Sequence, residues 1–118
     1  MHWAAYRNDA GIADSLLKHG ANPNSSDDHG VTPLSLAVLN ANLDLVKLLL
    51  SGGANPNLRQ INGQTALMIA SRVGKKSIVE ALLNAGANVN DAEKTKEHTA
   101  LMMAVAGQHK DVTKLLIE

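Results

Sequence analysis

The sequence contains no cysteine, and this absence excludes several kinds of site. Without a thiol, the chain can form no disulfide framework, no thiolate metal site and no cysteine nucleophile. Aromatic residues make up only 2% of the 118 residues, and phenylalanine is missing altogether. Because hydrophobic residues still account for 45% of the chain, the interior must be filled mainly by alanine and leucine. This composition predicts one small, all-helical domain.

The sequence also lacks an excess charge of either sign and lacks a long apolar run. Lys and Arg together number 11, as do Asp and Glu, so the formal net charge is zero. No overall field would therefore attract nucleic acid or an anionic membrane, and we expect no nucleic-acid partner. No apolar stretch approaches the roughly 18 residues that cross a bilayer, and the N-terminus carries no signal-peptide pattern. We therefore expect no membrane insertion.

A recurring four-residue segment is the strongest positive feature of the chain. Ala21-Asn22-Pro23-Asn24 returns as Ala54-Asn55-Pro56-Asn57 and as Ala87-Asn88-Val89-Asn90, and 54 − 21 and 87 − 54 both equal 33. A strict period of this length indicates stacked repeats. Such repeats bury their apolar faces only against neighbours and present an extended surface instead of a closed pocket. The pattern therefore favours binding over catalysis.

Each repeat carries signals for the start and the end of a helix. A glycine follows a leucine-rich run in three units and predicts a helix C-terminus in the left-handed conformation, at Gly20, Gly53 and Gly86. A threonine precedes an Ala- and Leu-rich run and predicts a helix N-cap, at Thr32, Thr65 and Thr99. Apolar residues cluster twice between these landmarks. Each unit is therefore predicted to form two short antiparallel helices followed by a polar loop.

These landmarks resemble the ankyrin repeat, whose pattern of about 33 residues begins a helix with Thr-Pro-Leu-His-x-Ala. Thr32-Pro33-Leu34 matches that start, and the family's Gly-Ala-x-x-Asn ending also occurs in register. The resemblance covers the whole chain. It implies an all-α, ankyrin-repeat solenoid of stacked antiparallel helix pairs joined by β-hairpin-like loops. We expect a single array over 1–118, with repeats at about 1–26, 27–59, 60–92 and 93–118.

The family resemblance also implies a function. Ankyrin proteins usually grip their partners with the hairpin tips and with the exposed side of the first helices, which line a concave groove. We therefore expect an intracellular (cytoplasmic or nuclear) module that binds a protein or peptide partner, with a monomer favoured. The first and last units are both incomplete, so we expect a fragment of a longer array or protein. The alternative is a non-catalytic regulatory or targeting segment of a larger enzyme, channel or effector.

The family pattern places candidate partner-binding residues at two kinds of position. On the first helices they are Tyr6, Arg7, Leu39, Asn40, Arg72 and Val73, followed by Ala106 and Gly107 in the last unit. In the hairpins they are Asp28, His29, Val31, Arg59, Ile61, Asn62, Gln64, Lys96 and His98. Tyrosine and arginine are residue types that anchor protein interfaces. A structural interpretation stays open for each, since Leu39 or Ile61 can pack on a neighbouring repeat.

The third loop departs from the others in length and in composition. Nine positions separate Asn90 from Thr99, whereas eight separate the equivalent residues of the earlier loops. Glu97 stands near the slot that Gly30 and Gly63 occupy, so we expect the turn to change shape. The charged segment 91–98 is either a partner contact or a solvated tip.

The residues that catalysis or metal binding would need are scattered. The five histidines fall at different repeat positions, and no pair has the spacing of metal ligands on one helix. The sequence contains neither a P-loop nor a Gly-x-Gly-x-x-Gly motif. We expect no catalytic, metal or cofactor-binding residue and no cofactor. Methionines fill irregular gaps, so Met68, Met102 and Met103 are predicted to lie in the core.

The asparagine that ends each repeated motif, at 24, 57 and 90, has two interpretations. Its side chain is predicted to brace the hairpin through hydrogen bonds to the backbone. The resemblance supplies the alternative, because an intracellular oxygenase hydroxylates the similar asparagine in some ankyrin proteins.

Overall fold

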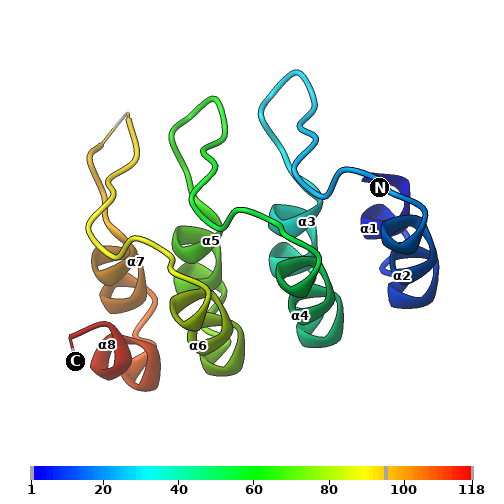
Figure 1. Ribbon diagram of the computed structural model, residues 1–118. Coiled ribbons are helices and arrows are strands. Elements are labelled where there is room, and N and C mark those ends of the chain that lie inside the picture. The colour runs from blue at the N-terminus through cyan, green and yellow to red at the C-terminus, as the bar shows by residue number, and fades with distance from the viewer. Residues whose placement is uncertain (1, 95, 118) are drawn as a thin grey trace.

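The computed structural model describes residues 2–94 and 96–117, and the side chain of residue 2 lies outside this description. Its helices are α1 (His2–Tyr6), α2 (Ala10–Lys18), α3 (Pro33–Leu39), α4 (Leu43–Ser51), α5 (Ala66–Val73), α6 (Lys76–Asn84), α7 (Ala100–Ala106) and α8 (Lys110–Ile117). Consecutive helices form antiparallel pairs that stack side by side, with the two chain ends at opposite ends of the stack (Figure 1). We call α1, α3, α5 and α7 the inner helices and α2, α4, α6 and α8 the outer helices.

The predicted helix starts and ends are confirmed. The hydroxyl oxygens of Thr32, Thr65 and Thr99 accept hydrogen bonds from the third backbone N–H of α3, α5 and α7. Pro33 occupies the first position of α3, where no N–H is needed. At the other end of each unit, Gly20, Gly53 and Gly86 adopt φ values of 86°, 98° and 92° just after the outer helix. These caps divide the chain into units of 33 residues, with one extra residue in the third loop.

Each inner helix turns into its outer partner through one residue in the left-handed conformation. These residues are Asn8, Ala41, Gly74 and Gln108. In the first two units the next residue caps the outer helix, since the side chains of Asp9 and Asn42 accept hydrogen bonds from Ile12 and Leu45. The third unit has Lys75 at this position, and its side chain makes no capping bond. The start of α6 therefore lacks the side-chain cap that stabilises the starts of α2 and α4.

A column of alanines sets the close spacing of the inner helices. Ala4, Ala37, Ala70 and Ala104 recur at the repeat period, and each is completely buried. Since alanine carries only a methyl group, neighbouring inner helices approach closely, α1 against α3, α3 against α5 and α5 against α7. Larger side chains fill the space between inner and outer helices, among them Leu34, Leu45, Leu49, Leu67, Ile78 and Leu82. This interior needs no buried aromatic residue.

Three polar loops project from successive repeats along the stack, all toward the same side (Figure 1). We call them finger 1 (25–31), finger 2 (58–64) and finger 3 (91–98). Each closes like a β-hairpin: in finger 2 the Gln60 N–H donates to the Gln64 carbonyl at 2.9 Å. Finger 3 closes one residue later, through a 2.9 Å bond from the Glu93 N–H to the His98 carbonyl. An antiparallel bridge between Ala92 and Thr99 lies at its base.

The turn of finger 3 corrects one expectation from the sequence. The finger is longer, as predicted, but Glu97 itself adopts the left-handed conformation, with φ 56°, where Gly30 and Gly63 have φ 77° and 84°. The turn therefore keeps its left-handed residue despite the missing glycine. The earlier slots need glycine for a second reason, because a Cβ on Gly63 would lie 2.7 Å from the Lys94 nitrogen in the next finger. The Glu97 side chain itself is exposed.

Asparagine side chains link the first repeat to the second and the second to the third, which confirms hydrogen bonds to the backbone for two of the three asparagines. The Asn57 amide donates to the Gly86 carbonyl at 3.1 Å, and its oxygen accepts the Asn88 N–H at 2.7 Å. Asn24 makes the equivalent bonds to Gly53 and Asn55. These bonds tie the base of one finger to the end of the next outer helix.

The fingers are also tied directly to one another. The Ile61 N–H donates to the His29 carbonyl at 2.8 Å, and the Lys94 N–H donates to the Asn62 carbonyl at 3.1 Å. The three fingers therefore form a connected wall beside the inner helices.

Among the helices that the structure describes, none combines the length and the apolar character that crossing a membrane requires.

Candidate partner-binding groove

A groove runs between the finger wall and the inner helices. Its first hollow, of ≈ 350 Å³, is lined by Tyr6, Val31, Ser35, Leu36, Leu39, Gln60, Gln64, Ile69 and Arg72. Its second hollow, of ≈ 700 Å³, is lined by Gln64, Arg72, Glu93, Lys96, His98, Met102, Met103, Ala106 and Gly107. Because Gln64 and Arg72 line both hollows, the two join into one groove that spans all four inner helices.

The repeat period arranges the groove residues in three columns. One column lies at the ends of the inner helices and contains Tyr6, Leu39, Arg72 and Ala106. A second lies at the base of the fingers and contains Val31, Gln64 and His98. The third forms the floor and contains Leu36, Ile69 and Met103. Each column changes chemistry from one repeat to the next, so the groove differs along its length although the scaffold repeats.

The half of the groove near α1 and α3 is apolar. Tyr6 and Leu39 are 66% and 55% exposed, and Leu36 lies almost fully buried beneath them. Arg72, at the far edge of this first hollow, is its one charged lining residue. These exposed side chains contribute little to the core, so their apolar surface is available for a partner.

The half near α5 and α7 carries the charges. Arg72, Lys96 and His98 line it together with Glu93, and Met103 and Ala106 supply apolar surface below them. Among the residues that the structure describes, Arg72 and Lys96 form no ion pair. Their positive charges therefore face the second hollow without a described carboxylate bound to them.

Glu93 has a structural task within finger 3. The residue is buried, with only 7% of its surface exposed. The Oε1 atom accepts hydrogen bonds from the backbone N–H groups of Lys96 at 2.6 Å and of His98 at 3.3 Å. Since bonds to an ionised acceptor are strong, this carboxylate holds the longer finger closed and positions Lys96 and His98 at the groove.

Arg59 also has a structural partner, although the sequence placed it among the binding residues. Its guanidinium pairs with the Asp91 carboxylate at 2.9 Å and donates to the Ala92 carbonyl at 2.9 Å. Arg59 therefore ties finger 2 to finger 3 and does not line either hollow. Nothing in the sequence indicated this pairing, because Asp91 lies in the irregular third loop.

The structure brings together nine of the predicted site residues. These line the groove: Tyr6, Val31, Leu39, Gln64, Arg72, Lys96, His98, Ala106 and Gly107. Asp28, His29, Ile61 and Asn62 are exposed on the fingers, away from both hollows. The remaining residues, Arg7, Asn40 and Val73, are exposed next to the inner-helix ends, where the Arg7 guanidinium lies 5.2 Å from the centre of the Trp3 ring.

The floor of the groove was missed by reasoning from the sequence. Leu36, Ile69 and Met103 recur three positions before the inner-helix column, so the repeat period itself carried the signal. Met68 is buried and confirms its predicted place in the core, whereas Met103 is only half-buried. The core prediction for Met102 is wrong, since this residue is 53% exposed. It occupies the position of buried Ser35 and Met68, but among the described helices no further inner helix stacks on α7 to cover it.

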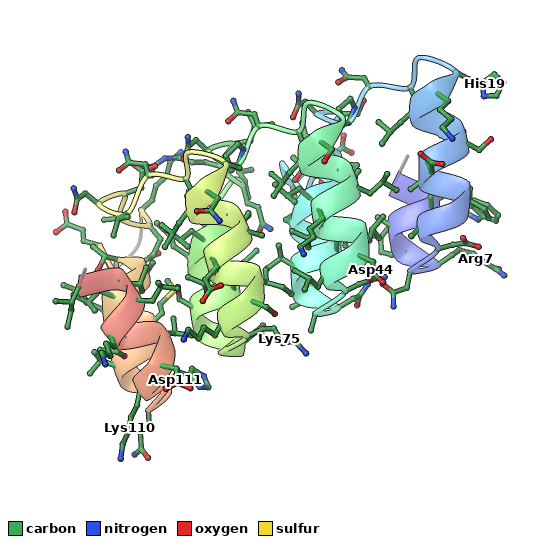
Figure 2. All side chains as sticks on the ribbon, turned by 60° about the horizontal axis from the view of Figure 1, so that its bottom comes forward. Arg7, His19, Asp44, Lys75, Lys110 and Asp111 are labelled. Carbon is green, nitrogen blue, oxygen red and sulfur yellow. The ribbon has the colours of Figure 1, made fainter. Side chains whose placement is uncertain are left out.

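The side of the stack that faces away from the fingers carries charges of both signs. Asp44, Lys75, Lys110 and Asp111 project there from the beginnings of the outer helices (Figure 2). Alternating signs produce no single-sign field on this side. Among the described residues, no group of three or more His, Asp or Glu is arranged to hold a metal ion.

Comparison with known families decides what this architecture is. A family profile described as ankyrin repeats, in three copies, matches residues 1–60 and again 37–118. The chain belongs to the ankyrin-repeat family. The predicted family and the all-α ankyrin fold are thereby confirmed. No match was found among curated proteins.

Membership of the family fixes the general role of the scaffold. Ankyrin repeats are generally protein–protein interaction modules and are typically non-catalytic. Within this ankyrin array, the residue type changes from repeat to repeat along the groove columns, whereas the buried column of the inner helices is alanine in every repeat. This contrast distinguishes the groove from the scaffold.

Proposed function

We propose that this array binds a partner protein or peptide along the groove between the fingers and the inner helices. The observation that supports this proposal most directly is the exposure of Tyr6 and Leu39 at successive positions of one column. Both side chains protrude beside a floor that is already packed. Their exposure serves no folding purpose, whereas their burial under a partner removes apolar surface from water.

Three further features support the same surface. The asparagine and finger-to-finger hydrogen bonds hold the groove wall in place before any partner arrives. A preorganised surface loses less conformational entropy on binding. The groove also combines aromatic, aliphatic and arginine side chains, which are the types that dominate interface energetics.

The test uses a phage-displayed library of random peptides. Peptides of about ten extended residues span the roughly 30 Å across four inner helices at the usual spacing of packed helices. After selection on the wild-type chain, the Kd of the enriched peptides is measured by fluorescence anisotropy for the wild type and for Leu39→Glu. A charge beneath the peptide is expected to weaken binding at least about tenfold.

The matched control is Lys47→Glu, because Lys47 is exposed on the outer helix α4. This variant should bind like the wild type, and circular dichroism melts should show both variants folded. If no peptide is enriched, or if Leu39→Glu binds as tightly as Lys47→Glu, the proposed function is wrong.

We also propose, on the basis of the family, that the array acts as a monomer inside the cell, in the cytoplasm or nucleus. Sedimentation velocity tests the first statement and imaging of the tagged protein tests the second. The fingertip residues Asp28, His29, Ile61 and Asn62 are proposed as additional contacts for a partner too large to lie wholly within the groove.

A further inference from the structure

We propose that the groove selects an extended peptide segment in which an acidic side chain lies about three residues from an apolar one. The apolar side chain packs on Tyr6 and Leu39, and the acidic one binds Arg72 and Lys96. This inference rests on the proposed function and specifies the chemistry of the partner.

The position of the apolar contact follows from the first hollow. Tyr6, Leu39 and Val31 surround it, with Leu36 and Ile69 as its floor. Arg72 at its edge is the one charged residue among those that line it. A charged side chain placed between Tyr6 and Leu39, away from the Arg72 edge, would lose hydration against mainly apolar surface, whereas an apolar side chain would lose nothing.

The position of the acidic contact follows from the second hollow. Arg72 and Lys96 approach it from α5 and from finger 3, and neither forms an ion pair with a described residue. Arginine presents a planar fork of donors that matches a carboxylate. Arg59 provides an internal contrast, because its guanidinium is already occupied by Asp91.

The other charged groups near this hollow do not cancel its positive character. The carboxylate of Glu93 accepts hydrogen bonds from the backbone of its own finger. Glu97 is exposed on the finger and does not line the hollow. His98 lines the hollow and adds ring nitrogens, one of which can donate a hydrogen bond while the other accepts one. A basic partner segment would therefore meet two cations without a free carboxylate.

The spacing follows from the repeat geometry. Leu39 and Arg72 occupy the same column on adjacent inner helices. Packed helices lie roughly 10 Å apart, and an extended chain rises about 3.3 Å per residue, so about three residues separate the two contacts. The chain direction of the peptide does not alter this spacing.

The library described above also tests this inference. Enriched peptides are expected to share an Asp or Glu about three residues from a Leu, Met, Phe or similar side chain. A selected peptide is then resynthesised with Asn or Gln in place of its acid. Its affinity for the wild type should fall at least about tenfold, and binding should weaken as ionic strength rises.

Charge reversal on the protein is the complementary measurement. Arg72→Glu and Lys96→Glu should each weaken the acidic peptide at least about tenfold and should leave the amide peptide nearly unchanged. Lys47→Glu on the outer face is the control for net charge, and melting curves identify any variant that fails to fold. A single-stranded oligothymidylate probe distinguishes peptide recognition from simple polyanion binding.

The outcomes separate this inference from the proposed function. If Leu39→Glu abolishes binding but the enriched peptides are neutral or basic, the groove binds peptides and the acidic specificity is wrong. If the acidic peptide binds Arg72→Glu as tightly as the wild type, the placement of the acid is wrong. If the oligothymidylate binds the wild type as tightly as the selected peptide does, the acidic-peptide specificity is also overturned. If no peptide is enriched, both proposals fail.

Discussion

The Arg59 guanidinium lies 2.9 Å from the Asp91 carboxylate, across the boundary between fingers 2 and 3. The two side chains are 38% and 20% exposed, so solvent only partly screens their attraction. The same guanidinium donates to the Ala92 carbonyl. Arg59 and Arg72, which look alike in the sequence, therefore have different tasks: the first holds the wall together and the second faces the groove.

This difference predicts the effect of Arg59→Ala on stability. We expect the free energy of unfolding to fall by about 1 kcal/mol, because one partly exposed ion pair and one backbone bond are lost. Urea denaturation measures the change, and Arg72→Ala is the matched control with an expected change below about 0.5 kcal/mol. In a double-mutant cycle with Asp91→Asn, complete additivity would contradict a direct interaction.

The asparagine links predict a contrast between two residues at the same repeat position. Asn57→Ala removes a donor to Gly86 and an acceptor for the Asn88 N–H, so unfolding should become easier by about 1–2 kcal/mol. Asn90→Ala should change little, since its side chain makes no bond to another described residue. Thermal and urea melts of the two variants provide the measurement. Equal losses would mean that the links contribute nothing specific.

The missing cap of α6 predicts a stabilising substitution. Lys75→Asn should raise the free energy of unfolding by about 1 kcal/mol, because its side chain can accept the Ile78 N–H, which now donates only to the residue 75 carbonyl, as Asn42 accepts the Leu45 N–H. Asn42→Ala is the reciprocal change and should lower stability by a similar amount. A Lys75→Asn variant that melts with or below the wild type would refute the capping argument.

The left-handed conformation of Glu97 predicts a second stabilising change. Such a conformation costs a non-glycine residue roughly 1–2 kcal/mol, while glycine adds about 0.5–1 kcal/mol of unfolded-state entropy. Glu97→Gly should therefore stabilise the chain by about 0.5–1 kcal/mol. The control is Lys94→Gly, where φ is not positive and the entropy loss alone should destabilise. If both variants shift the urea midpoint equally, the strain at Glu97 is not real.

The sequence predicted the scaffold because the scaffold is local and periodic. Thr65 at a helix start and Gly53 after a helix end act through the nearest turn of backbone, and three equivalent copies confirm each signal. The family pattern predicts Tyr6, Leu39 and Arg72 as exposed residues at one repeated position of the first helices, and all three line the groove.

The errors arose where contacts depend on the neighbouring unit. Arg59 meets a carboxylate that the irregular third loop supplies, and no local pattern reports such a partner. Met102 is exposed because burial at its position comes from the following helix pair and not from its own. Glu97 keeps the left-handed turn of Gly63, and the need for glycine at 63 itself arises from the next finger, where a Cβ would meet the Lys94 nitrogen. The periodic pattern therefore predicts the secondary structure within each repeat, whereas the contacts of a residue such as Arg59 depend on the adjacent repeat.

The ties between repeats join adjacent units: Asn57 reaches Gly86, and the Lys94 N–H reaches Asn62. Small rotations at successive junctions therefore add along the stack and together set its curvature. A ligand that spans Tyr6 to Lys96 acts on the three junctions between the four inner helices at once. Such a ligand would oppose any rotation that separates its contacts, and at the first two junctions the asparagine ties oppose the same rotation.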